Sequence, residues 1–589
     1  MRALVETKAL VGERGAYRLA RAVQTLQIPA TAQAILAARI DRLSPEHKRL
    51  LQAASVIGKD VPFSLLHAVA DEGDEALRRG LAELQATEFL YETRLFPDVE
   101  YTFKHALTHE VTYGTLLQDR RRVLHARIVA AIEQLHGDRL GEQMELLAHH
   151  AVRGEAWDKA VVYLREAGTK AFGRSANADA VSYFTKGLDI VATLPEGADR
   201  DRHELALLLY LGPAIQVLKG LGAPEAERVF SRARELSERV GETGLAFRAL
   251  WGQWMVSAGR GRIAPARRIG GELLTLAERT NDRALLLEAH HAMWATSFWL
   301  GELPAAEHHI QQGISLYDRE QHRSLAFLYG GHDAGTCCRC FSAWTHWLFG
   351  RPLQAVAASE AAIALAEQIA HPPTIAIGLT WACTLLYFER NARATGHLAR
   401  RLIDLAAERD LPPWRVAGTI FDGWTRAESG EGPAGVAQIR EGLLAAKTTG
   451  TLMPLEPLYM LVLTDACWRL GQAEEGLRAI DEALAMMAAM GEQIWLSELH
   501  RLKGELLLMR APSDHASAEG AFREALAIAH QQGAQAWELR AAASLGRVLG
   551  RRGRRDEARQ ILGDVYGRFT EGLDTANLTE ARALLAELS

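Results

Sequence analysis

Residues 458–470 read LYMLVLTDACWRL, and after Gly471 the chain continues with AEEGLRAIDEALAMMAAM at 473–490. The first segment is apolar nearly all round, so a helix made from it must be covered on several sides. In the second segment the large apolar residues recur at helical spacing on one face, opposite the charged residues: Leu477, Ile480, Leu484 and Met487. Since glycine commonly ends a helix, the sequence predicts an inner helix followed by an outer, half-solvated helix.

Helix-ending residues return along most of the chain at intervals of about 40 residues, a period typical of solenoids. One series follows the inner helices: Gly301, Gly350, Asn391, Gly430, Gly471, Arg510 and Gly553. A second series follows the outer helices, with a double step after Asn281: Gly241, Asn281, His371, Asp410, Gly450, Gly491 and Gly533. About nine helix pairs fit between residues 200 and 572, and a weaker pair fits at 142–194. We therefore expect a right-handed, tetratricopeptide-like α-solenoid with helices longer than usual for that class.

The double step contains an irregular insertion at Tyr329–Cys340, which reads YGGHDAGTCCRC. Its glycines disfavour a helix, and a loop that interrupts a solenoid is more often functional than a helix in the stack. Cysteines and histidines are concentrated in and near this insertion: Cys337, Cys338, Cys340, His332 and His346. In one interpretation they form a soft-metal cluster. In the other the cysteines are small core residues at the start of an inner helix over 341–348. A zinc knuckle needs separated pairs of ligands, so the spacing predicts no metal site.

The first 140 residues have a different pattern. Ser44-Pro45-Glu46 predicts a helix start, with serine as the N-cap and proline in the first turn. Short helices are predicted at 62–70 and 74–85, and alternating β-formers around Pro97-Asp98 predict a hairpin. Helices followed by a hairpin and a further helix are the outline of a winged helix. The predicted fold class is therefore mainly α, a winged-helix-like N-terminal domain followed by the solenoid.

Tryptophans recur on the predicted inner helices: Trp294, Trp299, Trp344, Trp347, Trp381, Trp424 and Trp468. In one interpretation they fill the core between stacked helix pairs. In the other they line the concave face and anchor a peptide, because aromatic residues dominate such interfaces. The sequence alone leaves both interpretations open and favours the first.

The composition excludes several classes of protein. Hydrophobic residues make up 48% and charged residues 24% of the 589 residues, which are globular values. The net charge of -6 lacks the basic excess of a nucleic-acid coat or a membrane-surface protein. The start resembles no secretory signal, and the apolar run at 374–388 is shorter than the roughly 20 residues that span a bilayer. Because five cysteines suit a reducing compartment, we expect a soluble, cytoplasmic protein with no membrane partner.

The sequence contains no phosphate-binding loop. That loop requires G-x-x-x-x-G-K-[ST], whose backbone N–H groups cradle phosphates. The pair Gly58-Lys59 has Ala53 where the first glycine should stand and Asp60 where serine or threonine should stand. We therefore expect that this chain is not an enzyme on its own, with no catalytic residue and no cofactor.

Several strings of the chain resemble one bacterial family. They are residues 28–66 (IPATAQAILAARIDRLSPEHKRLLQAASVIGKDVPFSLL), residues 89–117 (FLYETRLFPDVEYTFKHALTHEVTYGTLL), the YGGHDAGTC loop, and residues 566–588 (YGRFTEGLDTANLTEARALLAEL). Proteins of this family carry a class III adenylate/guanylate cyclase domain, an AAA/STAND-type ATPase, a winged-helix segment and a tetratricopeptide array. The resemblance covers nearly the whole chain, and it implies that the chain corresponds to the C-terminal, regulatory half of such a protein.

The resemblance also implies a domain organisation. Residues 1–27 would be the remnant of the ATPase module's end, 28–140 the winged-helix-like domain, 141–200 the first helical repeats and 201–589 the solenoid. The cyclase carboxylates and the phosphate loop of the family would precede Met1. ATP and Mg²⁺ are therefore expected in that missing module and not on this chain.

One residue is a candidate for nucleotide contact through the resemblance. In STAND-type ATPases a winged-helix histidine can contact the phosphates of the bound nucleotide, and His105 is the candidate, with His109 second. Imidazole suits this role because it donates to phosphate and titrates near neutrality. The other interpretation is that His105 starts a helix and packs on the hairpin.

The predicted function is a non-catalytic regulatory and scaffold region. The solenoid would bind a protein or peptide and relay that event to a STAND-type ATPase or nucleotidyl cyclase module in signal transduction. One alternative is a transcription regulator that binds DNA through the winged helix, and another is a part of an ATP-binding cyclase that acts only with its N-terminal half. DNA binding is disfavoured because the predicted third helix mixes both signs of charge: Glu75, Arg78, Arg79 and Glu83.

Overall fold

The computed structural model describes residues 10–11, 18–19, 30–94, 98–449 and 455–589. Over these residues the chain is mainly α-helical, which confirms the predicted fold class. It divides into two compact units, residues 1–170 with 185–194 and residues 171–184 with 195–589. Each unit has a hydrophobic core of its own.

The first unit combines helices with two small antiparallel sheets. Its elements are β1 (Leu10–Val11), β2 (Arg18–Leu19), α2 (Ala30–Asp41), α3 (Pro45–Ile57), β3 (Asp60–Pro62), α4 (Phe63–Val69), α5 (Asp74–Ala86), β4 (Leu90–Arg94), β5 (Glu100–Phe103), α6 (Ala106–Gly114), α7 (Gln118–Leu135), η2 (Gly137–Gln143) and α8 (Met144–Arg153). Helices α9 (Trp157–Gly173) and α10 (Asn177–Val191) contribute residues to both units. Strand β1 pairs with β2, and the second sheet has the strand order β3-β5-β4. The predicted ATPase remnant at 1–27 lies outside the described residues apart from these first two strands.

The predicted local signals of the first unit are confirmed. The Ser44 side chain accepts a hydrogen bond from the His47 N–H at 3.2 Å, and Pro45 stands in the first turn of α3. The two short helices are α4 and α5, and the hairpin is β4–β5, with Leu90 opposite Phe103. The winged-helix assignment of this unit stays a prediction.

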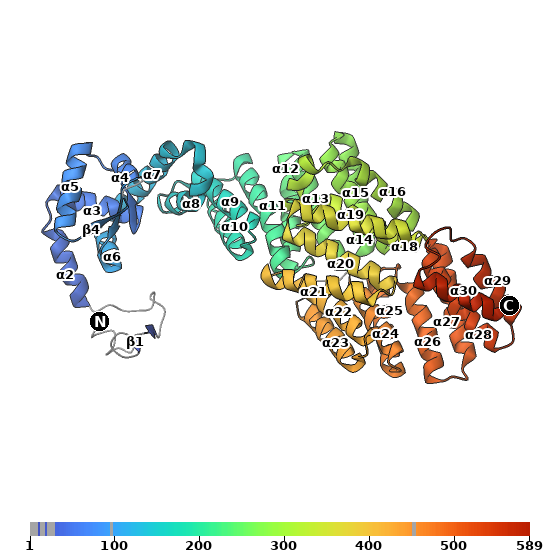
Figure 1. Cartoon of the computed structure of the whole chain (residues 1–589). Helices are drawn as coiled ribbons and strands as arrows, with labels where there is room; N and C mark the ends of the chain where they lie inside the picture. Colours follow the sequence, from blue (N-terminus) through green and yellow to red (C-terminus); the bar gives the residue numbers. More distant parts are fainter. Residues whose placement is uncertain (1–9, 12–17, 20–29, 95–97, 450–454) are drawn as a thin grey trace. The chain divides into compact units, whose positions relative to one another are not determined.

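The second unit is a stack of helix pairs, visible from α11 onward in Figure 1. Within the described residues it contains nine pairs and a final helix: α11 (Ala198–Lys219) with α12 (Pro224–Val240), α13 (Thr243–Gly259) with α14 (Ile263–Thr280), α15 (Arg283–Trp299) with α16 (Leu303–Leu316), α18 (Ala334–Leu348) with α19 (Pro352–Ile369), α20 (Pro372–Phe388) with α21 (Ala392–Glu408), α22 (Pro412–Glu428) with α23 (Gly432–Thr449), α24 (Glu456–Arg469) with α25 (Ala473–Met490), α26 (Leu496–Arg510) with α27 (His515–Gln532), α28 (Gln535–Arg551) with α29 (Arg555–Tyr566), and α30 (Ala576–Leu588). This number of pairs agrees with the sequence expectation.

The division into inner and outer helices is confirmed by the pair α24 and α25. Helix α24 is buried continuously from residue 457 to 467, whereas α25 buries one face that includes Leu477, Ile480 and Met487. Gly471 between them has φ +74, a left-handed conformation that glycine adopts without a steric penalty. Each pair therefore presents its first helix to the interior of the stack.

The insertion is shorter than the sequence suggests. Helix α17 (Arg319–His322) and η3 (Arg323–Phe327) precede it, and α18 begins at Ala334 rather than at residue 341. The early start has a local cause, because the Asp333 side chain accepts a hydrogen bond from the Thr336 N–H at 2.7 Å and so caps the helix. The irregular part therefore ends at Asp333, and the three cysteines lie inside α18.

Helix pairs that are remote in sequence meet through their inner helices. The ring of Trp347 on α18 lies 4.8 Å from that of Trp537 on α28, and Phe298 on α15 lies 6.1 Å from Trp495. The backbone N–H of Gln493 donates to the carbonyl of Trp299 at 2.8 Å. These contacts fill part of the inner surface of the stack, in line with the favoured interpretation of the tryptophans as core residues.

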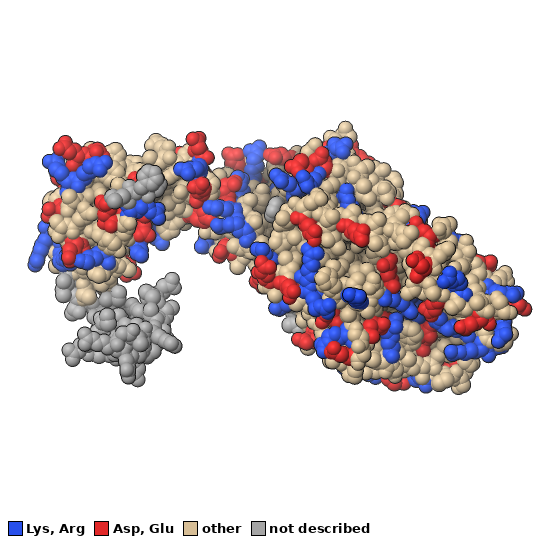
Figure 2. Space-filling model, viewed as in Figure 1, with Lys and Arg blue, Asp and Glu red and all other residues tan. Residues whose placement is uncertain are grey.

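None of the described helices is both long and apolar enough to cross a membrane. The apolar run at 374–388 lies in α20, which is a buried core helix as predicted. On the visible face of the second unit, basic and acidic side chains are interspersed (Figure 2).

Candidate functional site

A cavity of about 210 Å³ lies in the second unit between the first helices of successive pairs. Residues of α13, α15, α18, α20 and α22 form its walls, together with the end of α11. Five large aromatic rings line it: Trp254, Trp299, Phe341, Trp381 and Trp414. Apolar cavities with a few convergent polar groups are the usual form of ligand sites in proteins.

The aromatic walls are fixed by contacts within the protein. The indole N–H of Trp254 donates to the hydroxyl of Thr296 at 3.0 Å. Trp381 stacks on Trp344 with ring centroids 5.2 Å apart, and the Trp344 indole N–H donates to the Trp381 carbonyl at 2.9 Å. The cavity is therefore preformed. Trp344 fills the core, as the first interpretation predicts, and Trp381 lines the cavity. The anchoring of a peptide by these tryptophans stays a prediction.

One wall of the cavity is polar. His291 of α15, His332 of the insertion and Cys337 of α18 bring one ligand-type atom each to within 4.8 Å of one another. The ring centroids of His291 and His332 lie 5.1 Å apart in an edge-on arrangement. These three residues, called the His-His-Cys cluster below, all line the cavity.

Burial determines the protonation of the His-His-Cys cluster. Loss of solvent lowers the pKa of both His291 and His332 to about 3, so both rings are neutral at neutral pH. Burial also raises the pKa of the Cys337 thiol and of the Glu288 carboxyl well above their usual values. Glu288 is 1% exposed, and its Oε2 lies 3.0 Å from Nδ1 of His291.

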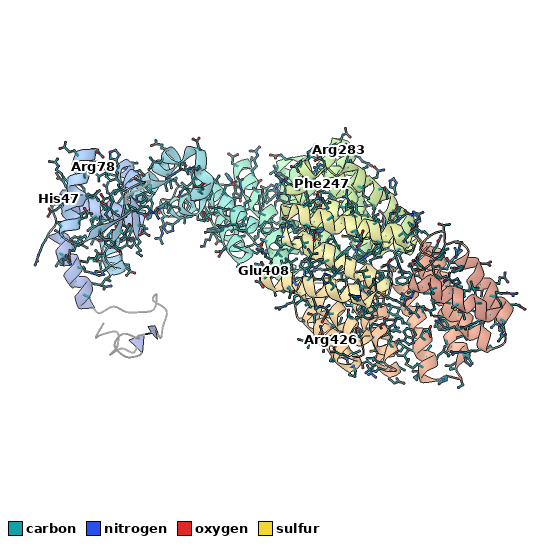
Figure 3. All side chains as sticks on the ribbon, viewed as in Figure 1. His47, Arg78, Phe247, Arg283, Glu408 and Arg426 are labelled. Carbon is teal, nitrogen blue, oxygen red and sulfur yellow. The ribbon has the colours of Figure 1, made fainter. Side chains whose placement is uncertain are left out.

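The insertion positions His332 and is itself held in place by buried polar contacts. The Tyr317 hydroxyl donates to Asp333 at 3.0 Å, and the backbone N–H of Asp333 donates to the Thr374 hydroxyl at 3.1 Å. The ring of Tyr329 packs edge-on against Phe247, which Figure 3 labels, with centroids 5.9 Å apart. The Tyr329–Cys340 segment thus forms a wall of the cavity.

The structure separates the cysteines and histidines that the sequence groups together. Of that set only His332 and Cys337 join the cluster. The Cys338 thiol donates to the Gly335 carbonyl at 3.2 Å, and Cys340 is buried in the core. Sequence reasoning missed His291, which lies one pair earlier. The available signal was a histidine on an inner helix with a glutamate one turn before it.

His105 and His109 take different positions in the first unit. His105 is exposed at the N-cap of α6, and nothing in the structure tests its predicted contact with nucleotide phosphates. His109 is the residue that packs on the hairpin, with its ring 5.1 Å from Phe103. Its neighbour Tyr113 begins a chain of buried polar groups, because its hydroxyl lies 3.1 Å from Nε2 of His125.

That chain ends in a buried histidine pair whose protonation should make the first unit sensitive to acid. Nδ1 of His125 lies 2.8 Å from Nδ1 of His150, and burial together with the nearby His149, Arg153 and Arg121 lowers the pKa of His125 to about 4.

In the unfolded chain the His125 imidazole takes up a proton below about pH 6.5. In the folded unit it takes up this proton only near pH 4. The free energy of unfolding should therefore fall as the pH drops, by about 2 kcal/mol for His125 alone between pH 7 and pH 5 and by about 3 kcal/mol once the pH reaches 4. Thermal unfolding of the first unit at pH 7 and pH 5 measures the effect. His125→Gln should reduce the pH dependence, and the exposed His105→Gln is the matched control that keeps it. Equal slopes in all three proteins would contradict the prediction.

No family model matches the chain. The chain is 29% identical over 525 residues to an uncharacterized protein of Rhizobium meliloti (strain 1021), and this match covers 88% of the chain and 50% of that protein. The chain therefore spans about half the length of the curated relative it matches.

Several solved structures are similar to the chain at low identity. A STAND signal transduction ATPase with a tetratricopeptide repeat sensor from Pyrococcus horikoshii shows 12% identity and a TM-score of 0.34, over 96% of this chain and 68% of that one. A Rap protein complexed with competence and sporulation factor shows 10% identity and a TM-score of 0.37, over 73% of this chain and 99% of that one. Yeast Tom70 shows 14% identity and a TM-score of 0.32, over 73% of this chain and 96% of that one. At this identity the likenesses concern the fold alone.

Proposed function

We propose that the chain is the non-catalytic sensor and scaffold part of a signalling protein, and that its aromatic cavity receives a protein or peptide partner. The cavity carries this proposal. Its walls are apolar, preformed and large enough for one bulky side chain, at about 210 Å³. The inner surface around Trp347 and Trp495 is filled by remote helix pairs. The partner therefore inserts one large side chain whose apolar surface packs on the aromatic walls, and the contacts outside the cavity are made at its rim.

The family resemblance supports the second part of the proposal. A STAND-type ATPase or nucleotidyl cyclase module would receive the signal and supply ATP and Mg²⁺, with His105 as the predicted phosphate contact. The chain by itself would then neither turn over ATP nor form cyclic nucleotides. Steady turnover by the purified chain that exceeds a mock preparation would contradict this part.

Filling the cavity should abolish partner binding. Ala258 lines the cavity and is half-buried, so Ala258→Phe places a ring inside it. Peptides are first selected on the full wild-type chain from a randomised library, and their affinities are then measured by fluorescence polarisation. We expect Ala258→Phe to weaken them at least tenfold, about 1.4 kcal/mol.

The matched control is Ala357→Phe, which adds the same ring on the exposed face of α19. It should bind the selected peptides like the wild type. The proposal fails if the library yields no binder, or if the binders keep their affinity for a folded Ala258→Phe variant.

A further inference from the structure

We propose that the His-His-Cys cluster is a zinc site with its fourth coordination position open to the aromatic cavity. His291, His332 and Cys337 offer two imidazole nitrogens and one sulfur within 4.8 Å of one another. Zn²⁺ prefers nitrogen and sulfur ligands in a tetrahedral arrangement, and sites with three protein ligands keep a position for an exogenous group.

The second shell of the cluster supports this assignment. Nδ1 of His291 lies 3.0 Å from the Glu288 carboxylate, and Nδ1 of His332 lies 3.0 Å from the Gly330 carbonyl. Metal-binding histidines usually donate one ring N–H to a carboxylate or a carbonyl, which orients the ring and increases its basicity as a ligand. Because Nδ1 of each ring has such a partner, Nε2 is the nitrogen left for the ion.

The local charges also suit a divalent cation. A Cys337 thiolate and a Glu288 carboxylate would together balance the two charges of Zn²⁺. Both groups are almost fully buried, at 3% and 1% exposure, where an unpaired ion is costly. Among the residues described around the cluster, Asp333 is held by other partners, since it accepts hydrogen bonds from Tyr317 and Thr336.

Aromatic rings pack closely against the rest of the polar wall. Gly330 and Gly331 have φ of +69 and +71, and a Cβ on Gly330 would meet the Trp251 ring at 2.7 Å. His291 stacks on Trp294 with centroids 4.7 Å apart. The zinc site would give the cavity its polar contact, so that a partner carrying a thiol, imidazole or carboxylate would bind the ion directly. This inference deepens the proposed function, but its test requires no partner.

The test uses the full chain, stripped with a chelator and reconstituted with Co²⁺ or Zn²⁺. We expect about one ion per chain, a tetrahedral Co²⁺ spectrum and a thiolate-to-cobalt charge-transfer band, with Zn²⁺ displacing Co²⁺. Cys337→Ala should lose the charge-transfer band. Cys340→Ala, an equally buried cysteine on the same helix, is the matched control and should keep it. Glu288→Gln should weaken Zn²⁺ binding 10- to 100-fold in competition with a chromophoric chelator.

Circular dichroism of each variant establishes that it is folded before metal is added. A folded wild-type chain that binds no Co²⁺ or Zn²⁺ would overturn the zinc site, as would a band that survives in Cys337→Ala. Binding of Cu⁺ without binding of Zn²⁺ would also overturn it, and Met255 on the cavity wall makes copper the competing metal to include. Failure of peptide selection with intact metal binding would overturn only the proposed partner.

Discussion

Trp537→Ala should destabilise the second unit by about 3–5 kcal/mol, the usual cost of truncating a large buried aromatic side chain. Trp537 is fully buried on α28, with its ring 4.8 Å from Trp347 and 5.0 Å from Phe388. Its indole N–H has no hydrogen-bond partner within the described part of the chain, so the cost comes from lost packing. Urea unfolding followed by circular dichroism gives the change in midpoint without depending on tryptophan fluorescence.

Leu353→Ala is the control for this substitution within the same unit. Leu353 is 58% exposed on α19, and its truncation should cost about 1 kcal/mol or less. A cost for Trp537→Ala as small as that of the control would show that the contact between α18 and α28 does not form in solution. The inner surface would then be open, and an extended peptide could lie along it.

The contact between α18 and α28 joins helix pairs that are remote in sequence, and such contacts cannot be predicted from local sequence signals. Local signals act within one or two turns, so Ser44 and Gly471 predict the helix boundaries that the structure has. Nothing near Gly350 in the sequence indicates that it lies against α28 and the segment after α29, where an added Cβ would come within 2.7 Å of Phe569. The solenoid could therefore be predicted from its period, but the filling of its inner surface could not.

The candidate site shows the same limit. His332 and Cys337 belong to one sequence string, whereas His291 belongs to the previous helix pair and reaches them only through the stacking of α15 against α18. Spacing rules for metal sites assume ligands on one short motif, and they fail when two helix pairs supply them. The start of α18 at Ala334 could have been predicted from the sequence, because aspartate is a favoured N-cap residue and Asp333 precedes Thr336 by three positions. The two preceding glycines obscured it.

Glu498→Gln should destabilise the second unit by about 3–5 kcal/mol, because it leaves the buried Arg540 without a carboxylate partner and weakens the pairing of the buried Arg501. Glu498 is 1% exposed, and its Oε1 lies 2.7 Å from both Arg501 and Arg540. Burial lowers the pKa of Arg540 to about 10, while the Glu498 carboxylate favours the charged guanidinium and opposes this effect. Arg501→Met should cost less than Glu498→Gln, since Glu498 then still pairs with Arg540.

An exposed ion pair provides the control for the two substitutions in the buried network, Glu498→Gln and Arg501→Met. Arg426, labelled in Figure 3, pairs with Glu431 at 2.7 Å, but the two side chains are 40% and 60% exposed. Arg426→Ala should therefore cost about 0–1 kcal/mol in the same urea titration. Because Arg501 also lies 3.5 Å from Glu505, its removal leaves a second carboxylate short of a partner, and Arg501→Met should still exceed the control. A cost for Glu498→Gln no larger than that of Arg426→Ala would contradict the prediction. It would mean that water reaches Glu498, Arg501 and Arg540, and that α26 and α28 do not pack closely around them.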